Sequence, residues 1–389
     1  MGLTSLKMNI NFIPKNKSMM TTKYCFMLIP VLLFLSGCSN DDDGSKSSQS
    51  YTKIMKTNTG NASSFFMDDH KNLWVCGNNS HNQLGYTEAT SQYLPVKVLE
   101  NIDLVASGEQ HSLFLKTDGT LWAVGDNYSG QLGTGNTNGQ STPLQIAANV
   151  LYAAAGKDFS FFIKNDHTLW AMGNNTFGQL GNGNTNNQNT PVKIMDDAQS
   201  VSAAAAHTLI LKTDGTLWSC GRNTSYELGD GTDESKSTPV NIAANIKQMS
   251  VGNQFSLFLK NDNTLWGVGF DGAGQLGDGS TITAHNPKQI LNDVKKAEAG
   301  HGHSVVLKID GTVWAAGLND FGQLGNSNYV NSGHFEKIAE SVKEISAGTY
   351  HTILIKSDGT VWSAGSNGSG QLGTGTGLSD RNHFEQVNF

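Results

Sequence analysis

The stretch HSLFLKTDGTLWAVGDNYSGQLG, residues 111–133, recurs with changes along most of the chain. A tryptophan marks each copy, and the seven tryptophans are spaced 48 residues apart, at Trp74, Trp122, Trp170, Trp218, Trp266, Trp314 and Trp362. Glycine is the third residue after every tryptophan, and a Leu-Gly pair begins ten residues after it. A fixed period of this length indicates a propeller or a solenoid.

Each copy contains enough short apolar runs for four β-strands. The runs HSLFLK and TLWAVG flank a Thr-Asp-Gly turn, which predicts a hairpin because glycine supplies the positive φ that such a turn needs. A VKEISAG-type run and, before it, a PVKI-type run precede the hairpin. Strands that are apolar on both faces are typical of sheets covered on both sides. Seven copies of four strands predict an all-β chain folded as a seven-bladed β-propeller.

The two ends of the repeat region predict how the ring closes. The terminal segment HFEQVNF, residues 383–389, matches the first run of a repeat, HFEKIAE at 334–340. We therefore expect it to complete the blade whose other three strands come from residues 52–77. A ring closed in this way by its N- and C-terminal strands leaves no open sheet edge.

The repeated unit resembles a known family. Its pattern, G-x-x-H-S-x-x-L-x-x-D-G-x-x-W-x-x-G-x-N-x-x-G-Q-L-G, is similar to the RCC1 repeat (regulator of chromosome condensation), and the match covers about residues 51–389. The resemblance implies the propeller fold but no single function, since the family includes a nuclear exchange factor for a small GTPase, ubiquitin-ligase modules and secreted bacterial proteins, among them a β-lactamase inhibitor protein. The repeats here carry no long insertion like the wedge that the exchange factor uses, so GTPase regulation is the weakest expectation.

The N-terminal 37 residues predict a lipoprotein signal peptide. Four lysines precede the apolar run YCFMLIPVLLFLSGC, which is too short for a membrane span and ends in small residues. Leu35-Ser36-Gly37-Cys38 resembles the lipobox of bacterial lipoproteins, which implies that Cys38 carries the lipid. We expect residues 38–50 to form a flexible tether of at most about 40 Å and residues 51–389 to form the propeller.

Charge and the tether suggest where the protein works. Asp41-Asp42-Asp43 resembles the acidic signal that exports some Gram-negative lipoproteins to the outer surface, and it fits a solvated linker equally well. Without residues 1–37 the chain has 22 basic and 33 acidic residues, which disfavours nucleic acid as a partner. We expect a monomeric outer-membrane lipoprotein, exposed at the cell surface and held to the membrane only by its lipid.

Residues that suggest catalysis do not recur as catalysis would require. His111 returns as His207, His303 and His351, but the other copies have Ser63, Phe159 and Phe255. Phenylalanine cannot act as a base or a ligand, so we expect the histidines to pack and to make a local hydrogen bond. His301-Gly302-His303 lacks a third metal ligand at a suitable spacing.

Other motifs also favour a scaffold. The G-x-G-x-x-G runs at 272–277 and 368–373 lie in repeat loops without a following crossover helix, so they do not indicate a dinucleotide site. Cys76 and Cys220 occupy the same position three repeats apart, which predicts buried core residues without a disulfide. We expect no catalytic residues, no cofactor and no metal, and thus no enzyme.

What varies between the copies is therefore the better guide to function. The loops after the tryptophan strands and the G-x-x-H turns are expected on one face, called the top face. They place aromatic side chains at nonequivalent positions, namely His81, Tyr128, Phe177, Tyr226, Phe270, Phe321 and Tyr350. Exposed aromatics are typical anchors of protein or carbohydrate interfaces, although such residues also pack inward under loops. We expect a non-catalytic module that binds a protein partner on this face, or alternatively a glycan.

Overall fold

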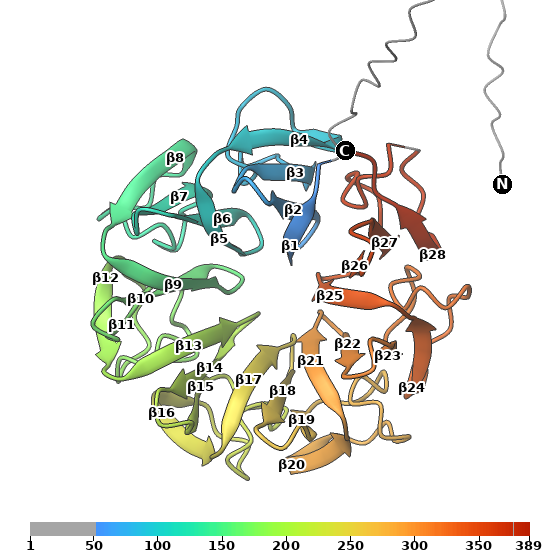
Figure 1. Ribbon diagram of the computed structural model, residues 1–389. Coiled ribbons are helices and arrows are strands. Elements are labelled where there is room, and N and C mark those ends of the chain that lie inside the picture. The colour runs from blue at the N-terminus through green and yellow to red at the C-terminus, as the bar shows by residue number, and fades with distance from the viewer. Residues whose placement is uncertain (1–51, 376) are drawn as a thin grey trace, which may run out of the picture. The chain divides into compact units, whose positions relative to one another are not determined.

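The computed structural model of the chain describes residues 52–375 and 377–389. These residues form seven four-stranded antiparallel sheets arranged in a ring (Figure 1). The seven-bladed β-propeller is thereby confirmed. The expected signal peptide, the tether and the lipidation site Cys38 lie outside the described residues. Within the described part, no helix is long and apolar enough to cross a membrane.

Each blade is a simple meander whose strand order follows the chain, so blade 1 is β1–β4 and blade 7 is β25–β28. The inner strands are β1 (Ile54–Thr59), β5 (Ile102–Ser107), β9 (Val150–Ala155), β13 (Ala198–Ala203), β17 (Ile246–Val251), β21 (Val294–Ala299) and β25 (Val342–Ala347). The second strands are β2 (Ser63–Asp68), β6 (His111–Lys116), β10 (Phe159–Lys164), β14 (His207–Lys212), β18 (Phe255–Lys260), β22 (His303–Lys308) and β26 (His351–Lys356).

The remaining strands complete the blades toward the outside of the ring. The tryptophan strands are β3 (Leu73–Asn78), β7 (Leu121–Gly125), β11 (Leu169–Gly173), β15 (Leu217–Gly221), β19 (Leu265–Gly269), β23 (Val313–Gly317) and β27 (Val361–Gly365). The outer strands are β4 (Ser91–Leu99), β8 (Gln140–Ala147), β12 (Gln188–Met195), β16 (Lys236–Ala243), β20 (Ala284–Leu291), β24 (Ser332–Ala339) and β28 (Arg381–Gln386).

The hairpin between the second strand and the tryptophan strand forms for local reasons. In blade 2, Gly119 has a φ of 79°, and the amide of Lys116 donates to the carbonyl of Thr120 at 2.9 Å. Asp118 Oδ1 accepts from the amide and the hydroxyl of Thr120, whose Oγ1 accepts from Trp122 Nε1 at 2.9 Å. The Lys116 ammonium lies 4.2 Å from the centre of the Trp122 ring, a favourable cation–π contact. The recurring Asp-Gly-Thr-x-Trp motif is thus one self-contained turn.

The core lies between neighbouring blades. Leu113 and Leu115 on β6 and Leu121 on β7 pack with Val150 and Phe162 of blade 3 in one buried cluster. Every residue of β6 except its last is buried, as expected for a strand covered on both faces. Burying a leucine side chain of this kind contributes about 1.5–3 kcal/mol. The repeated apolar runs therefore stabilise contacts between blades as well as the blades themselves.

The two cysteines of the propeller are core residues. Cys76 and Cys220 are buried free thiols, which confirms the prediction made from their repeat position. Burial raises the pKa of Cys220 to about 12 and raises that of Cys76 as well. Both side chains therefore remain neutral thiols at neutral pH.

The predicted pairing of the C-terminal strand is wrong. β28 pairs with β27 through Trp362 and Gln386, and blade 1 has its own outer strand, β4. The reason is that the chain, after each tryptophan strand, turns back along the outer edge of that same strand. The PVKI-type run is accordingly the last strand of one blade and not the first strand of the next, so no blade is shared between the two termini.

Side-chain and loop contacts close the ring instead. The termini do meet at this junction, where β1 lies against β25 and β26 and the Phe389 ring lies 5.1 Å from the Phe66 ring. Ser64 Oγ donates to the Gln371 carbonyl at 2.6 Å, and the Gly375 amide donates to the Tyr93 carbonyl at 3.2 Å. Closure thus uses the same contacts that join the other blades.

Candidate binding face

The top face is formed by two sets of connections that meet at the same ends of the strands. In blade 2, His111 pairs with Gly125, which also pairs with Gln140, so the turn before β6 and the loop before β8 lie together. The seven turns are 60–62, 108–110, 156–158, 204–206, 252–254, 300–302 and 348–350. The seven loops are 79–90, 126–139, 174–187, 222–235, 270–283, 318–331 and 366–380. The predicted clustering of these segments on one face is confirmed.

A buried asparagine holds six of the seven long loops in shape. Asn127 Oδ1 accepts from the Leu132 amide at 2.9 Å, while Asn127 Nδ2 donates to Thr134 Oγ1 and to the carbonyls of Asn136 and Asn138. Asparagine occupies this position in six blades, as Asn79, Asn127, Asn175, Asn223, Asn319 and Asn367. The loops are therefore fixed from inside, and the side chains at their tips are free to vary.

Blade 5 breaks this rule, because Asp271 replaces the asparagine. Its Oδ1 accepts from the Leu276 amide at 2.8 Å, but its Oδ2 is buried with no hydrogen-bond partner among the described residues. Burial, together with the nearby negative charge of Asp278, raises the pKa of Asp271 to about 6. Protonation would give Asp271 a donor where the other blades have the amide NH₂ group, and above pH 6 that proton is lost.

Asp271→Asn is expected to stabilise the protein at pH 7.5 by about 1–3 kcal/mol, because it restores a donor to buried acceptors. The raised pKa means that the wild-type contribution is fully present below pH 4 and is lost as the pH rises through about 6. The gain in melting temperature of the variant over wild type should therefore grow between pH 4 and 7.5. A gain independent of pH would contradict this account.

Three of the sequence-predicted side chains are free on the top face. Tyr128 is 85% exposed, and Phe177 and Phe270 are exposed at 41% and 38%. Each sits in a polar loop whose structural hydrogen bonds are made by other residues, such as Asn127 beside Tyr128. All three side chains are exposed, Tyr128 most of all, while the Phe270 ring also packs over Gly272.

Two aromatic clusters hold the next three predicted residues. The ring centres of Phe321 and Tyr350 lie 4.8 Å apart, and those of Tyr350 and His301 lie 5.2 Å apart. These contacts join blade 6, which carries Phe321 and His301, to blade 7, which carries Tyr350. The Tyr226 ring stacks on the His285 ring of the next blade, with the ring centres 3.9 Å apart. The backbone of Tyr226 has a φ of 63°, which lies in the left-handed region. Glycine occupies the equivalent position in most other blades, so a tyrosine here is held at a conformational cost.

His81 is the seventh predicted residue, and it is only half-buried. Its amide donates to Gln83 Oε1 at 2.9 Å, and its Nδ1 lies 3.0 Å from Ser80 Oγ, so its contacts are within its own loop. The seven predicted residues thus lie around the whole ring and do not form one continuous patch. Sequence reasoning missed Ile282, Tyr329, Val330 and Leu378, which are exposed apolar residues of the top loops.

The recurring histidines are structural. Their Nε2 atoms contact hydroxyls of the next blade in the pairs His111–Ser160 (2.8 Å), His207–Ser256 (3.0 Å), His303–Thr352 (3.2 Å) and His351–Ser64 (3.0 Å). Burial lowers the pKa of His111 and His351 to about 4 and the pKa of His207 and His303 to about 3. The expected packing role is confirmed, but the expected local hydrogen bond is wrong, because each histidine bonds to the neighbouring blade.

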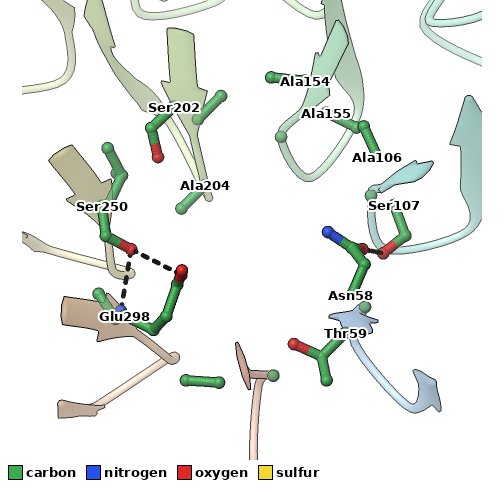
Figure 2. Close-up of a pocket in the computed structure, with 18 of the residues that line it drawn as sticks. Asn58, Thr59, Ala106, Ser107, Ala154, Ala155, Ser202, Ala204, Ser250 and Glu298 are labelled. Atoms are coloured by element: carbon green, nitrogen blue, oxygen red, sulfur yellow. Dashed lines mark hydrogen bonds between the residues drawn. The ribbon is translucent and has the colours of Figure 1, made fainter. Parts of the chain in front are cut away.

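A central cavity of about 950 Å³ is lined by the inner strands and the top turns (Figure 2). Small side chains such as Ala106, Ala154 and Ser250 surround its middle. Its charged groups are balanced, with four lysines and four carboxylates, and Glu298 pairs with Lys296 at 2.9 Å. The interior therefore shows no preference for a charged ligand, and the surrounding face is the stronger candidate site.

One group of possible metal ligands occurs among the described residues, and it lies on the opposite, bottom face. Asp68, Asp69 and His70 come together in the hairpin between β2 and β3. The Asp68 carboxylate already accepts four hydrogen bonds, including one from Trp74 Nε1 at 3.0 Å. Asp68 Oδ2 accepts the tryptophan hydrogen bond that a threonine hydroxyl accepts in the other blades, so its role is accounted for by the hairpin.

Comparisons with known proteins agree with this geometry. The RCC1-like domain matches residues 37–291, and the regulator of chromosome condensation (RCC1) repeat matches residues 294–323 and 342–371, with a second RCC1 repeat description matching 310–355. No curated protein matches the chain significantly.

Solved structures share the fold at low sequence identity. Prp20p from Saccharomyces cerevisiae is 20% identical, with a TM-score of 0.73, covering 87% of this chain and 88% of that one. Human WBSCR16 is 19% identical, with a TM-score of 0.70, covering 78% of this chain and 86% of that one. The sequence repeat, the ring of seven blades and the match over more than half of the chain agree, and the protein belongs to the RCC1-like domain family.

Proposed function

We propose that the protein is a non-catalytic binding module whose top face docks a protein partner. The observation that carries this proposal is the exposure of large aromatic side chains, with Tyr128 foremost, in loops that are otherwise polar and internally hydrogen-bonded. Exposed aromatics on a rigid scaffold bind at little cost in conformational entropy. Within the family, Prp20p has been studied for binding to Gsp1p and histones, which supports a binding role without identifying this chain's partner.

The direction of β1 supports presentation of this face. β1 runs toward the turn 60–62 on the top face, so the chain enters the propeller from the bottom at Thr52 and Lys53. The described part of the chain therefore starts on the face opposite the top loops. We further propose that the tether ends in a lipid on Cys38 and that the protein is a bacterial outer-membrane lipoprotein exposed at the cell surface.

Anchoring through Cys38 is testable separately. Cys38→Ser removes the thiol that would carry the lipid, so we expect the protein to move from the membrane fraction to the soluble fraction of the cell. Cys220→Ser is the matched control, because that thiol is buried in the propeller. Continued membrane association of the Cys38→Ser protein would contradict the anchor.

Docking on the top face predicts a loss of partner capture when its free aromatics are removed. A Tyr128→Ala/Phe177→Ala/Phe270→Ala variant should capture its partner from cell-surface extracts at least about tenfold less well than wild type, since such anchors dominate interface energies. Ile309→Ala is the control, because Ile309 is 55% exposed on the opposite face. Equal capture by the triple variant and wild type would refute the proposed face.

A glycan ligand is the second candidate, favoured by the same exposed rings because sugars stack on aromatic faces. The stacked Tyr226–His285 pair offers one such platform. A glycan array probed with the full chain separates the two functions. Glycan binding that disappears in the triple variant, with no protein captured, would replace the protein-binding proposal.

A further inference from the structure

The tips of the long loops can be compared because each lies eleven residues after the buried asparagine, or after Asp271 in blade 5, and in four blades the same hydrogen bond marks the position. The buried asparagine donates to the carbonyl of Asn138, Asn186, Glu234 or Val330 in blades 2, 3, 4 and 6, at 3.0–3.2 Å. In blade 7 the carbonyl of Gly377 takes this place at 2.9 Å, directly before Leu378. In blade 5 the residue at the same spacing from Asp271 is Ile282. Since the carbonyl does the structural work, the side chain at the tip is free to serve another purpose.

The tip side chains change character around the ring. Blades 2 and 3 carry asparagine, and blade 4 carries Asp233-Glu234. Blades 5, 6 and 7 carry Ile282, Val330 and Leu378, which are 75%, 69% and 49% exposed, and Tyr329 beside Val330 is also exposed. We call these four residues the apolar arc. Aliphatic side chains at the tips of three adjacent polar loops indicate an interaction surface, because isolated exposed residues would show no such grouping.

Charge is distributed just as unevenly. The turns and loops of the top face contain twelve carboxylates and two basic residues, Lys157 and Arg222. The rest of the propeller contains eighteen carboxylates and nineteen basic residues, so it is close to neutral. Some acidic groups are paired internally, as Glu227 is with Arg222 at 2.7 Å. The excess negative charge nevertheless lies on the top face, where it attracts cations and repels anions.

These two patterns lie next to each other. The exposed Asp233 and Glu234 at the tip in blade 4 are followed around the ring by the apolar arc of blades 5–7. Building on the protein-binding function proposed above, we infer that the top face recognises a cationic amphipathic segment of the partner protein. The apolar side of that segment would contact the arc, and its lysines or arginines would face Asp233, Glu234 and the other carboxylates of blades 1–4.

The charge pattern argues against other occupants. A second copy of this chain would present either the same acidic face or a nearly neutral one, so it would not complement the charge. Anionic lipid and nucleic acid would be repelled. A basic protein segment with apolar residues on one side fits both the arc and the charge.

A direct binding measurement tests this inference. The full chain is coupled to a sensor surface through its lysines, of which the top turns and loops contain one, Lys157. The probes are an amphipathic Lys/Leu peptide of about 18 residues, long enough for five helical turns, its scrambled sequence, its Glu/Leu counterpart, and oligolysine. We expect the Lys/Leu peptide to bind at least about tenfold more tightly than each of the other three at low salt.

Variants locate the contact. Ile282→Ser/Val330→Ser/Leu378→Ser should weaken binding of the Lys/Leu peptide at least about tenfold. Ile309→Ser should not change it, because Ile309 is an exposed residue of the bottom face. Asp233→Asn/Glu234→Gln should weaken binding at about 50 mM salt and have little effect at about 500 mM. All variants change exposed positions, and unchanged melting temperatures confirm that they fold.

Several outcomes would overturn the inference. These are no binding of the Lys/Leu peptide, equal binding of oligolysine, an arc variant that binds as wild type does, or arc-dependent binding of phosphatidylglycerol vesicles in place of peptide. The proposed function fails differently. It fails if the Tyr128/Phe177/Phe270 variant captures the partner normally, whereas loss of capture there with no peptide binding would leave the protein-binding function standing.

Discussion

Replacing Gly125 with alanine is expected to destabilise the propeller by at least about 3 kcal/mol and to lower its melting temperature by several degrees or more. Gly125 ends the tryptophan strand of blade 2 with a φ of 109°, which side-chain-bearing residues rarely adopt. A Cβ there would lie 2.4 Å from the Gln110 carbonyl oxygen and 2.7 Å from the His111 Cα. Both neighbours are backbone atoms, so neither can move aside cheaply.

Gly368→Ala is the control in the same chain. Its Cβ would meet no atom within 4 Å, and its φ is not in the left-handed region, so the change should stay within about 0.5 kcal/mol. Thermal unfolding followed by circular dichroism compares the two variants with wild type. Similar melting temperatures for both would show that the invariant glycine of the repeat is not a steric requirement.

The second large effect is a loss of stability of the propeller at acidic pH. The four buried histidines have pKa values lowered to about 4 or about 3 by burial, while they titrate near 6.5 in the unfolded chain. Their contribution to stability is therefore fully present above pH 6.5 and is lost as the pH falls toward the folded pKa values. For each histidine the loss at pH 4 is on the order of 3 kcal/mol, so the melting temperature should fall steeply between pH 6.5 and 4.

Phenylalanine tests the cause, because Phe159 and Phe255 already occupy the same position in blades 3 and 5. The hydroxyls that face His207, His303 and His351 each keep another partner, as Thr352 keeps the Gln323 carbonyl at 2.7 Å. A His207→Phe/His303→Phe/His351→Phe protein should therefore fold at pH 7 and lose much of the acid sensitivity that wild type shows. An unchanged melting profile between pH 6.5 and 4 would assign that sensitivity to other groups. His303→Phe alone should give a smaller change in the same direction.

Local sequence was enough to predict the blades and their number. Each hairpin is built from residues a few positions apart, such as Asp118, Thr120 and Trp122, so the repeat unit itself contains the information that forms it. Strand direction then follows from the order of runs and turns, which is why the top loops could be assigned correctly. The structural role of the histidines was also accessible, because inert residues replace them in other copies.

The candidate site was predicted only in part. The sequence located Tyr128, Phe177 and Phe270 in the loops, but their exposure depends on what the rest of each loop covers. The substitution of glycine by Tyr226 is visible in the aligned repeats, whereas its stacking on His285 joins two blades. The apolar arc was missed although Ile282, Val330 and Leu378 occupy the same position of the 48-residue repeat, because aliphatic residues in a loop do not show from sequence alone whether they lie in solvent.

The sequence by itself determined the fold class, the seven blades and the face on which variation gathers, since these depend on short-range patterns repeated every 48 residues. Tertiary structure alone decided which blade the C-terminal strand completes, because a PVKI-type run lies between two candidate partners and only the folded sheet selects one. It also decided which side chains remain in solvent and which neighbours they meet. Exposure and contact between blades are set by residues far apart in the chain, which no local pattern contains.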